Sequence, residues 1–418
     1  MRVRLTLAAA LVSGAAPVPA AEADAWLEVE SAHVTVRSDA GERKAAELAR
    51  QFERFRTSLY AVWPWIRGDA DPHIVVYAAR DESSLRRLLP SFWDEGGRPA
   101  GIALSGLGGG AVALRLDVPL PRFGRRNPFH VLYHEYVHLL LELRLEGLPA
   151  WLHEGLAEFF GAAVVDGNAM QVGWPISEHV LLLRQQPLLA TASLWEAGPA
   201  PEGPAHERSP VFYAQSWALV HHLLRGEWDG TLGPIGAYLA LRARGLDDGE
   251  ATRGSLGAPE SLDAAVRSHV GALTSTRRRV RVRVEVVDEP GAARRLDRAE
   301  LLAARGELML LAGFMERAGA LYQEALAVDP ASSAARQGLG LLAYHGGREA
   351  EAFVRLDEVA ASPAATAATC YLHAALLWKR EPAAGARARV RAGLLRALGL
   401  NPGLGPARQL LREIESVR

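Results

Sequence analysis

The residues best suited to chemistry lie close together in the first half of the chain. His134, Glu135 and His138 form the pattern H-E-x-x-H, and Glu154 and Glu158 follow in the pattern E-G-x-A-E. Residues four apart share one face of a helix, so His134 and His138 can offer two imidazole nitrogens to one metal ion. Two nitrogens and one carboxylate form the protein ligand set of a catalytic zinc site. The pattern therefore predicts metal-assisted hydrolysis, with Glu135 as the general base.

Two helices joined by a tight reversal are needed to bring these side chains together. Asn127 can cap the first helix, Pro128 can occupy its first position and Gly147 can end it. Pro149 can open a second helix, which carries Glu154 back towards the two histidines. The pairing of the two patterns favours a metal site over a chance H-E-x-x-H.

The sequences HEYVH and WLHEGLAE, which contain these patterns, resemble the gluzincins of the peptidase MA superfamily, a group that includes thermolysin and the zinc aminopeptidases. The resemblance implies that His134, His138 and Glu154 hold zinc. It also implies that Glu135 is the general base and that Glu158 is the acid that steadies a ligand histidine. Within that superfamily the chain looks most like secreted bacterial peptidases with a tail of helical repeats, whose substrates are largely unassigned.

A further catalytic donor is expected from the segment 212–224 (FYAQSWALVHHLL), which predicts an apolar helix. In gluzincins a phenol or imidazole from a later helix donates to the oxyanion of the tetrahedral intermediate, and the resemblance makes Tyr213 the candidate. His221 and His222 are alternatives. Packing within an apolar helix is the competing explanation for all three residues.

The other histidines are given no chemical role. His130 lies one turn before His134 on the same face, so it is expected to pack or hydrogen-bond beside the centre. An approach of His130 to the metal, the substrate or Glu158 stays open. His153 immediately precedes Glu154 and is expected to point elsewhere on its helix. No partner spacing stands out for His33, His73, His179 and His206.

Residues 22–125 predict a small mixed α/β part ahead of the metal helices. Its expected elements are two strands within 26–36, a helix over 41–63, a strand over 74–77, a helix over 81–89 and a strand over 111–116. In gluzincins an edge strand just before the zinc helix receives the extended substrate backbone, and residues 111–116 occupy that place in the chain. An internal strand without a ligand role is the alternative.

Residues 126–275 complete the expected zincin-like helical catalytic part. Within them, 185–210 is rich in proline, alanine and glycine and predicts a long loop. A linker is expected at 276–295, where three arginines precede the alternating sequence VRVRVEVV. Because no aromatic residues interleave with this basic run, a solvated linker strand is favoured over a nucleic-acid site.

The region 296–418 carries an internal repeat. Gly306 and Gly340 are thirty-four residues apart, and so are Ala318 and Ala352, which is the tetratricopeptide period. Small residues at these positions let paired helices approach closely, and about three units suffice to bury a continuous core. The tail therefore resembles tetratricopeptide repeats, which implies a surface for a peptide or protein partner. A structural buttress for the peptidase part is the alternative.

The first twenty residues predict a secretory signal, which indicates a periplasmic or secreted protein. Arg2 and Arg4 precede an apolar run, and small residues follow as far as Ala20. No segment has the length of a membrane-spanning helix. The formal net charge of −1 gives no global indication of a nucleic-acid or membrane-surface partner. The single cysteine, Cys370, excludes an intrachain disulfide framework and a multi-cysteine metal site.

These features together predict an α+β zincin-like metallopeptidase domain followed by an all-α tetratricopeptide-like repeat domain. The expected function is hydrolysis of peptide bonds with Zn²⁺ as the cofactor. Endopeptidase action is favoured, because residues 108–112 (GGGAV) lack the acidic residue with which the glycine-rich aminopeptidase motif binds a free amine. The alternatives are a catalytically inactive zincin-like scaffold that acts through its repeats, and a structural envelope protein with a chance motif.

Overall fold

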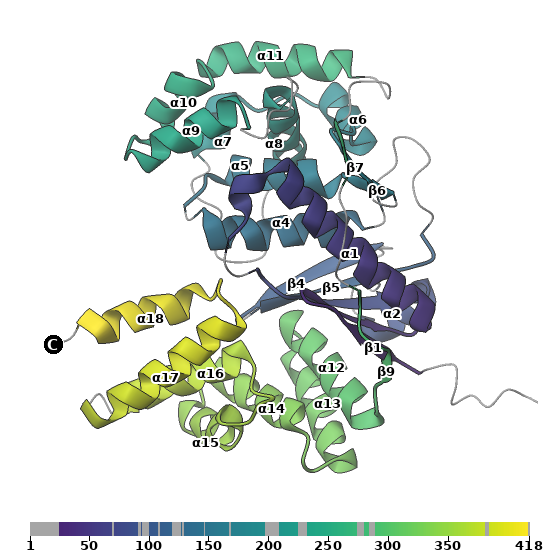
Figure 1. The fold of residues 1–418 in the computed structure, drawn as a ribbon, viewed down its shortest axis with the longest axis vertical. Coiled ribbons are helices and arrows are strands. Elements are labelled where there is room, and N and C mark those ends of the chain that lie inside the picture. Colours follow the sequence, from purple (N-terminus) through teal and green to yellow (C-terminus); the bar gives the residue numbers. More distant parts are fainter. Residues whose placement is uncertain are drawn as a thin grey trace, which may run out of the picture.

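The computed structural model describes residues 25–416 apart from short gaps, and three layers of secondary structure make up its body (Figure 1). The gaps are residues 69–70, 91–92, 94–99, 108, 119–126, 128, 146, 167–168, 197–208, 225–231, 274–279, 284–288 and 381–383. The predicted signal segment, residues 1–20, lies outside the described residues, as do Pro128 and His206.

The middle layer is a six-stranded mixed sheet. In spatial order its strands are β4 (Gly101–Gly106), β5 (Gly109–Arg115), β3 (Ile74–Ala79), β2 (Val34–Ser38), β1 (Leu27–Glu30) and β9 (Arg294–Arg295). Strands β2, β3 and β5 are parallel, while β4, β1 and β9 each run antiparallel to the strand they join. The strands predicted within 26–36 and over 74–77 are therefore confirmed.

The expectation that residues 111–116 form the substrate-receiving edge is wrong. They belong to β5, apart from the last residue, and β5 is an internal strand between β3 and β4. The edge strand is β4, which folds back on β5 through a tight turn that places Gly106 opposite Gly109. The glycine cluster therefore builds a hairpin. Its first strand, β4, has six residues, and no clear alternation in the sequence marks it.

Side chains of the sheet alternate between two cores. The helices of the N-terminal part are α1 (Glu42–Val62), η1 (Pro64–Ile66) and α2 (Glu82–Leu88). Val76 and Val112 face the core that contains α1, whereas Tyr77 and Ala113 face the core that contains α2 and the first helices of the tail. Both faces of the sheet are buried, which is typical of parallel strands covered by helices.

The helices of residues 130–272 lie on the α1 side of the sheet (Figure 1). They are α4 (His130–Arg144), α5 (Ala150–Gly161), α6 (Ser177–Gln185), α7 (Thr191–Glu196), α8 (Pro210–Leu223), α9 (Pro234–Ala243), α10 (Asp248–Ser255) and α11 (Pro259–Ala272). Helix α5 is the centre of this layer, because all twelve of its residues are buried. At Gly155 an added Cβ would lie 2.5 Å from the carbonyl oxygen of Ser216, so only glycine permits this approach of α8.

The structure corrects one prediction for a connecting segment and extends another. Residues 185–210 do not form one continuous loop, because α7 lies within them. The predicted linker strand does more than connect two parts, since β8 (Val280–Arg283) pairs with β7 (Ala169–Val172), which in turn pairs with β6 (Val164–Asp166). The strand β8 is held by a partner more than a hundred residues away, and local composition does not reveal such pairing.

The tail is built from helices that pair in sequence order. The pairs are α12 (Arg298–Leu311) with α13 (Met315–Val328), α14 (Ser333–His345) with α15 (Glu349–Ala360), and α16 (Ala367–Arg380) with α17 (Ala384–Leu400), followed by α18 (Gly405–Ser416). An added Cβ at Gly306 would lie 2.6 Å from the ring of Tyr322, and Ala318 and Ala352 are fully buried. Small residues therefore permit close helix pairing, as the repeat predicts.

The tail also covers the second face of the sheet (Figure 1). Leu308 of α12 is fully buried in one core with Tyr77 and Leu104. The Tyr77 hydroxyl donates a hydrogen bond to the Glu307 carboxylate (2.9 Å). At the tip of the β4–β5 hairpin, Leu107 packs against the later helix pairs. These contacts favour the interpretation of the tail as a structural buttress.

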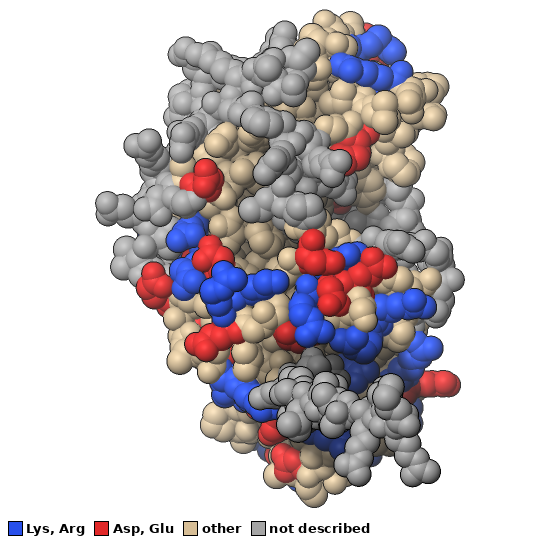
Figure 2. All heavy atoms as spheres, turned by 90° about the vertical axis from the view of Figure 1, so that its right-hand side faces the viewer, with Lys and Arg blue, Asp and Glu red and all other residues tan. Residues whose placement is uncertain are grey.

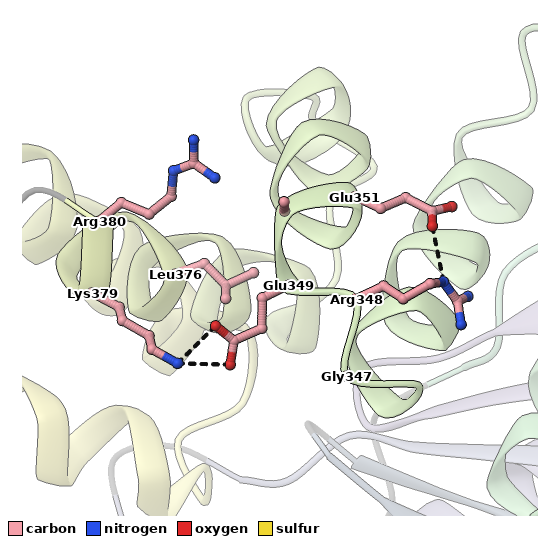
Figure 3. Close-up of a pocket in the computed structure, with 8 residues that line it drawn as sticks. Gly347, Arg348, Glu349, Glu351, Leu376, Lys379 and Arg380 are labelled. Atoms are coloured by element: carbon pink, nitrogen blue, oxygen red, sulfur yellow. Dashed lines mark hydrogen bonds and ion pairs between the residues drawn. The ribbon is translucent and has the colours of Figure 1, made fainter.

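A surface depression lies between α15 and α16 in the tail, well separated in sequence from the metal helices (Figure 3). Lys379 lies 2.7 and 2.8 Å from the two carboxylate oxygens of Glu349, and Arg348 donates to Glu351 (2.9 Å). Acidic and basic side chains that line the depression thus largely pair with one another. Acidic and basic side chains are also interspersed over the face in Figure 2, rather than gathered by sign.

Candidate metal centre

Aromatic packing fixes the rotation of α4 about its axis. The ring of Tyr133 stacks on Phe55 with centroids 3.8 Å apart, and the ring of Tyr136 meets Phe52 edge-on at 4.8 Å. These contacts bind one face of α4 to α1. The histidines of the H-E-x-x-H pattern therefore face α5 on the other side, where α4 and α5 pack together.

Asn127 ties the start of α4 to the end of α5 and does not cap the helix as predicted. Helix α4 begins at His130 after Phe129, and no side chain caps it. The Asn127 side chain accepts a hydrogen bond from the backbone N–H of Phe129 (3.0 Å) and donates to the carbonyl oxygen of Ala163 (2.6 Å). Gly147, at φ 74°, makes the predicted reversal in the left-handed region that favours glycine.

The two helices bring the three predicted ligand atoms into one small triangle. His134 Nε2 lies 2.9 Å from His138 Nε2, and Glu154 Oε2 lies 3.6 and 3.3 Å from these two atoms respectively. A tetrahedral zinc ion with bonds of about 2.0 Å spaces its ligand atoms about 3.3 Å apart. Glu154 is 5 % exposed, and its Oε2 makes no other hydrogen bond in the described part of the chain. The residues therefore fit a zinc ion.

Burial and neighbouring charges set the ionisation of the centre. Burial raises the pKa of Glu135 to about 7, and the negative charge of Glu154 adds to this shift while His138 opposes it. Burial lowers the pKa of His138, but the hydrogen bond and charge of Glu154 outweigh it and the net shift is upward. A carboxyl group with a pKa near neutrality can both accept and return a proton, as general-base chemistry requires.

Glu158, one turn after Glu154, lies among three further imidazole contacts. Its Oε2 is 3.0 Å from His130 Nε2 and 3.1 Å from His179 Nε2, while its Oε1 is 3.9 Å from His134 Nδ1. Burial raises the pKa of Glu158, but His130, His179 and His134 together hold it well below its usual range. The structure thus places Glu158 beside a candidate ligand, as expected, and in contact with His130.

His153 does not point away from the centre, so that prediction is wrong. Its ring stacks on the ring of His138 with centroids 4.4 Å apart and planes 10° apart, and the residue is 6 % exposed. A helix rotates by 100° per residue, so His153 diverges from Glu154 along α5. It still meets α4, because both sides of the buried helix α5 have neighbours.

The predicted oxyanion donor and its alternatives have different surroundings. Tyr213 is half-buried in the first turn of α8, and its ring meets Phe212 edge-on. Both ring nitrogens of His221 have partners: Nδ1 lies 2.8 Å from His269 Nε2, and Nε2 lies 3.2 Å from the carbonyl oxygen of Gly173. His221 is therefore committed to packing contacts, and Tyr213 stays the predicted donor.

Among the residues that the sequence left without a role, His179 lies in the cluster around the centre. It belongs to α6, which packs on α8, and no local spacing connects it to the H-E-x-x-H pattern. His130 did carry a signal, because it lies four residues before His134 on one helix face. His33 and His73 lie elsewhere, against Glu53 and Thr35 respectively.

Comparison of the sequence with protein-family models and with curated proteins gives no match. In the described part of the chain, no helix combines the length and the apolar character that crossing a bilayer requires. The geometry of the centre is therefore the basis for assigning a function.

Proposed function

We propose that the protein is a zinc-dependent peptidase of gluzincin type that cleaves internal bonds of peptide or protein substrates. The observation that carries the proposal is the triangle of His134 Nε2, His138 Nε2 and Glu154 Oε2, with edges of 2.9, 3.3 and 3.6 Å. A zinc ion bound there would act as a Lewis acid and lower the pKa of a bound water to about 7. With three protein ligands, a zinc ion would keep a position for that water.

Glu135 is the general base of the proposed reaction. It takes a proton from the water that attacks the peptide carbonyl and then delivers this proton to the departing amine. Burial raises the pKa of Glu135, whereas the positive charge of a bound zinc ion would lower it and favour the ionised carboxylate that accepts the proton. Tyr213 is the proposed donor to the oxyanion of the tetrahedral intermediate.

The substrate backbone is proposed to add to β4 as a further strand. One side of β4 pairs with β5, and the other side has no partner among the described strands. The strand also borders the metal helix, because an added Cβ at Gly101 would lie 3.4 Å from Val131 of α4. Main-chain pairing of this kind binds extended peptides with little demand on their sequence.

The proposal includes the remaining expectations from the sequence. The catalytic machinery belongs to residues 22–275, and residues 296–418 form the tetratricopeptide-like tail. The periplasmic or secreted location depends on residues 1–20, which lie outside the described part. The alternative of an inactive zincin-like scaffold keeps the same fold and differs only in the absence of turnover.

Glu135→Gln tests the proposed mechanism. Glutamine keeps the size of the side chain but cannot accept the proton, so the variant should lose hydrolysis by roughly 10²- to 10⁴-fold. It should retain about one zinc ion per chain, since Glu135 is not one of the three ligands. The measurements are cleavage of unfolded casein, with and without a chelator, and metal analysis of the purified protein.

Glu178→Gln is the matched control, because Glu178 is an exposed glutamate on α6 and is not among the charges that shift the pKa of Glu135. It should cleave casein at the wild-type rate. A Glu135→Gln variant as active as the wild type would sink the proposed mechanism. A wild-type protein that binds zinc but leaves casein and a mixed peptide library intact would favour the scaffold alternative.

A further inference from the structure

We propose that His130 and His179 are positioning residues of the metal centre, which hold the Glu158 carboxylate so that it orients the candidate ligand His134. The inference rests on the proposed function, because it concerns the same centre. It adds residues that neither the H-E-x-x-H pattern nor the second acidic pattern contains. It also assigns a role to His179, for which the sequence gives no spacing signal.

The four side chains come from three helices and converge in the interior. His130 and His134 belong to α4, Glu158 to α5 and His179 to α6. His130 is 4 % exposed, Glu158 5 % and His179 6 %, so water cannot readily replace their contacts. A buried carboxylate needs donors within the protein, since burial without them is costly.

Both imidazole contacts of Glu158 reach one of its oxygens. Its Oε2 lies 3.0 Å from His130 Nε2 and 3.1 Å from His179 Nε2, which are ion-pair distances, although the ring orientations do not give Oε2 a hydrogen bond. In each neutral imidazole one ring nitrogen carries the hydrogen, so the carboxylate favours the tautomers with hydrogen on Nε2. The two contacts from α4 and α6 fix the carboxylate between them.

The other oxygen of Glu158 is thereby directed at the ligand histidine. Oε1 lies 3.9 Å from His134 Nδ1, which is longer than a hydrogen bond and acts as a charge contact. A negative charge near Nδ1 favours the tautomer of His134 that carries its hydrogen there. The lone pair then lies on Nε2, the atom that faces His138 and Glu154. This tautomer is the one that binds a metal through Nε2.

Packing restricts the side-chain orientations that His130 and His179 can adopt. An added Cβ at Gly161 would lie 3.1 Å from Cε1 of His130, so α5 closes tightly over that ring. The ring of His179 meets the ring of Trp217 with centroids 5.6 Å apart. These neighbours restrict the rotation of both imidazole rings.

A second cation is the competing explanation, because ligand atoms of His130, His134 and Glu158 lie within 4.8 Å of one another. The positioning role is favoured by His179. Its Nε2 approaches the same oxygen of Glu158 as His130 does, at nearly the same distance, yet His179 is not part of that group. Two imidazoles beside one buried carboxylate oxygen account for this arrangement without a further ion.

The test compares His179→Gln with His179→Asn in the full-length chain. A glutamine amide can place an N–H near the position of the imidazole Nε2, whereas the shorter asparagine amide corresponds to Nδ1 and cannot reach Glu158. Zinc affinity is measured by competition with a chromophoric chelator. The visible spectrum of the cobalt-substituted protein reports the ligand geometry independently of turnover.

We expect His179→Asn to weaken zinc binding about tenfold and to alter the cobalt spectrum, and His179→Gln to stay within about threefold of the wild type. His269→Asn is the matched control, since His269 is 4 % exposed and its Nε2 contacts a histidine outside the centre. It should bind zinc like the wild type. His130→Gln and His130→Asn provide a second pair if a His179 variant does not fold.

Each outcome decides between the explanations. Equal zinc affinity in the glutamine variant, the asparagine variant and the wild type overturns the inference and leaves the proposed function standing. Two zinc ions per wild-type chain, with one lost in His130→Asn, would assign the cluster to a second cation and also overturn it. A wild-type chain that binds no zinc overturns the proposed function together with this inference.

Discussion

Glu154 and Glu158 lie one turn apart on α5, yet their carboxylates have different neighbours. Glu154 Oε2 faces the two ring nitrogens of the H-E-x-x-H pattern at 3.3 and 3.6 Å. Glu158 lies against His130 and His179 at 3.0 and 3.1 Å. One face of a single helix therefore provides both a candidate ligand and the group that supports another ligand.

Because the two glutamates have different contacts, replacing each by glutamine should affect zinc binding to a different extent. Glu154→Gln removes one of three ligands and should abolish stoichiometric zinc binding. Glu158→Gln leaves the ligands in place and should weaken zinc affinity by roughly ten- to a hundredfold. Competition with a chelator measures both. Glu178→Gln, an exposed glutamate on α6, is the control and should match the wild type. Equal losses in the first two variants would contradict these separate roles.

Glu53 is a buried carboxylate outside the centre, and its donors make its ionisation important for stability. It accepts hydrogen bonds from the Ser31 hydroxyl (2.6 Å), the backbone N–H of His33 (3.0 Å) and Arg56 Nε (2.9 Å). Burial raises the pKa of Glu53, but these donors and the His33 imidazole outweigh burial and lower the pKa to about 2. The folded state therefore holds the charged form.

The pKa of Glu53 predicts how stability depends on pH. A folded pKa of about 2, below the ordinary 4.5, means that this stabilisation is present above pH 4.5. It is lost as the pH falls from there towards 2, by on the order of 3 kcal/mol in total. Glu53→Gln should therefore lower the free energy of unfolding at pH 7 and flatten its decline in acid. Urea unfolding between pH 3 and 7 measures both; parallel pH profiles in the two proteins would contradict the prediction.

At the residue scale, the sequence predicts contacts within one helix and misses contacts between helices. The spacing of His134 and His138 places both on one face whatever the fold, and the structure brings them together. His179 reaches Glu158 only because α6 packs on α8, and this packing joins segments that are far apart in the sequence. The stacking of His153 on His138 has the same origin.

At the element scale, α5 and α8 approach so closely at Gly155 that a side chain there would collide with α8. An added Cβ at Gly155 would lie 2.5 Å from Ser216 O and 2.6 Å from Val220 Cγ2. The first of these is a backbone atom, which can move only with its whole helix. The glycine of the E-G-x-A-E pattern is therefore a packing requirement of the helix that carries Glu154.

Gly155→Ala should force α5 and α8 apart and destabilise the fold by about 1–3 kcal/mol, despite the higher helix propensity of alanine. Gly271→Ala is the matched control, because Gly271 lies in α11 with no atom within 4 Å of an added Cβ. That variant should equal or slightly exceed the wild type in stability. Urea denaturation of the two variants measures the difference. Equal midpoints would show that α8 can shift at little cost.

At this scale, helices that local periodicity specifies can be predicted from the sequence, whereas strands that pair with distant segments cannot. In the structure α1 spans residues 42–62 and α8 spans 210–223. Both are close to the ranges 41–63 and 212–224 that the periodicity of apolar residues predicts. Sheet order depends on pairing between separate segments, so the sequence indicates neither β4 nor the internal position of β5. For the same reason it does not indicate the pairing of β8 with β7.

At the scale of the whole molecule, the sheet connects the two helical parts. Its one face shares a core with α1 and the metal helices, and its other face shares a core with α12 and α13. The proposed substrate strand β4 touches both, because Gly101 meets Val131 of α4 and Gly106 meets Leu311 of α12. The tail is therefore in a position to hold the edge strand in place for a substrate.

Removing tail contacts should loosen this edge strand. Leu308→Ala opens a cavity in the shared core, where Leu308 is fully buried, and should destabilise the protein by about 2–5 kcal/mol. Leu394→Ala, equally buried between α16 and α17, should cost a similar amount. Hydrogen exchange separates the two variants: amides of β4 and β5 should exchange faster in Leu308→Ala but keep wild-type protection in Leu394→Ala. Unchanged protection of β4 and β5 in Leu308→Ala would mean that the tail is an independent module, and partner binding would then be its better explanation.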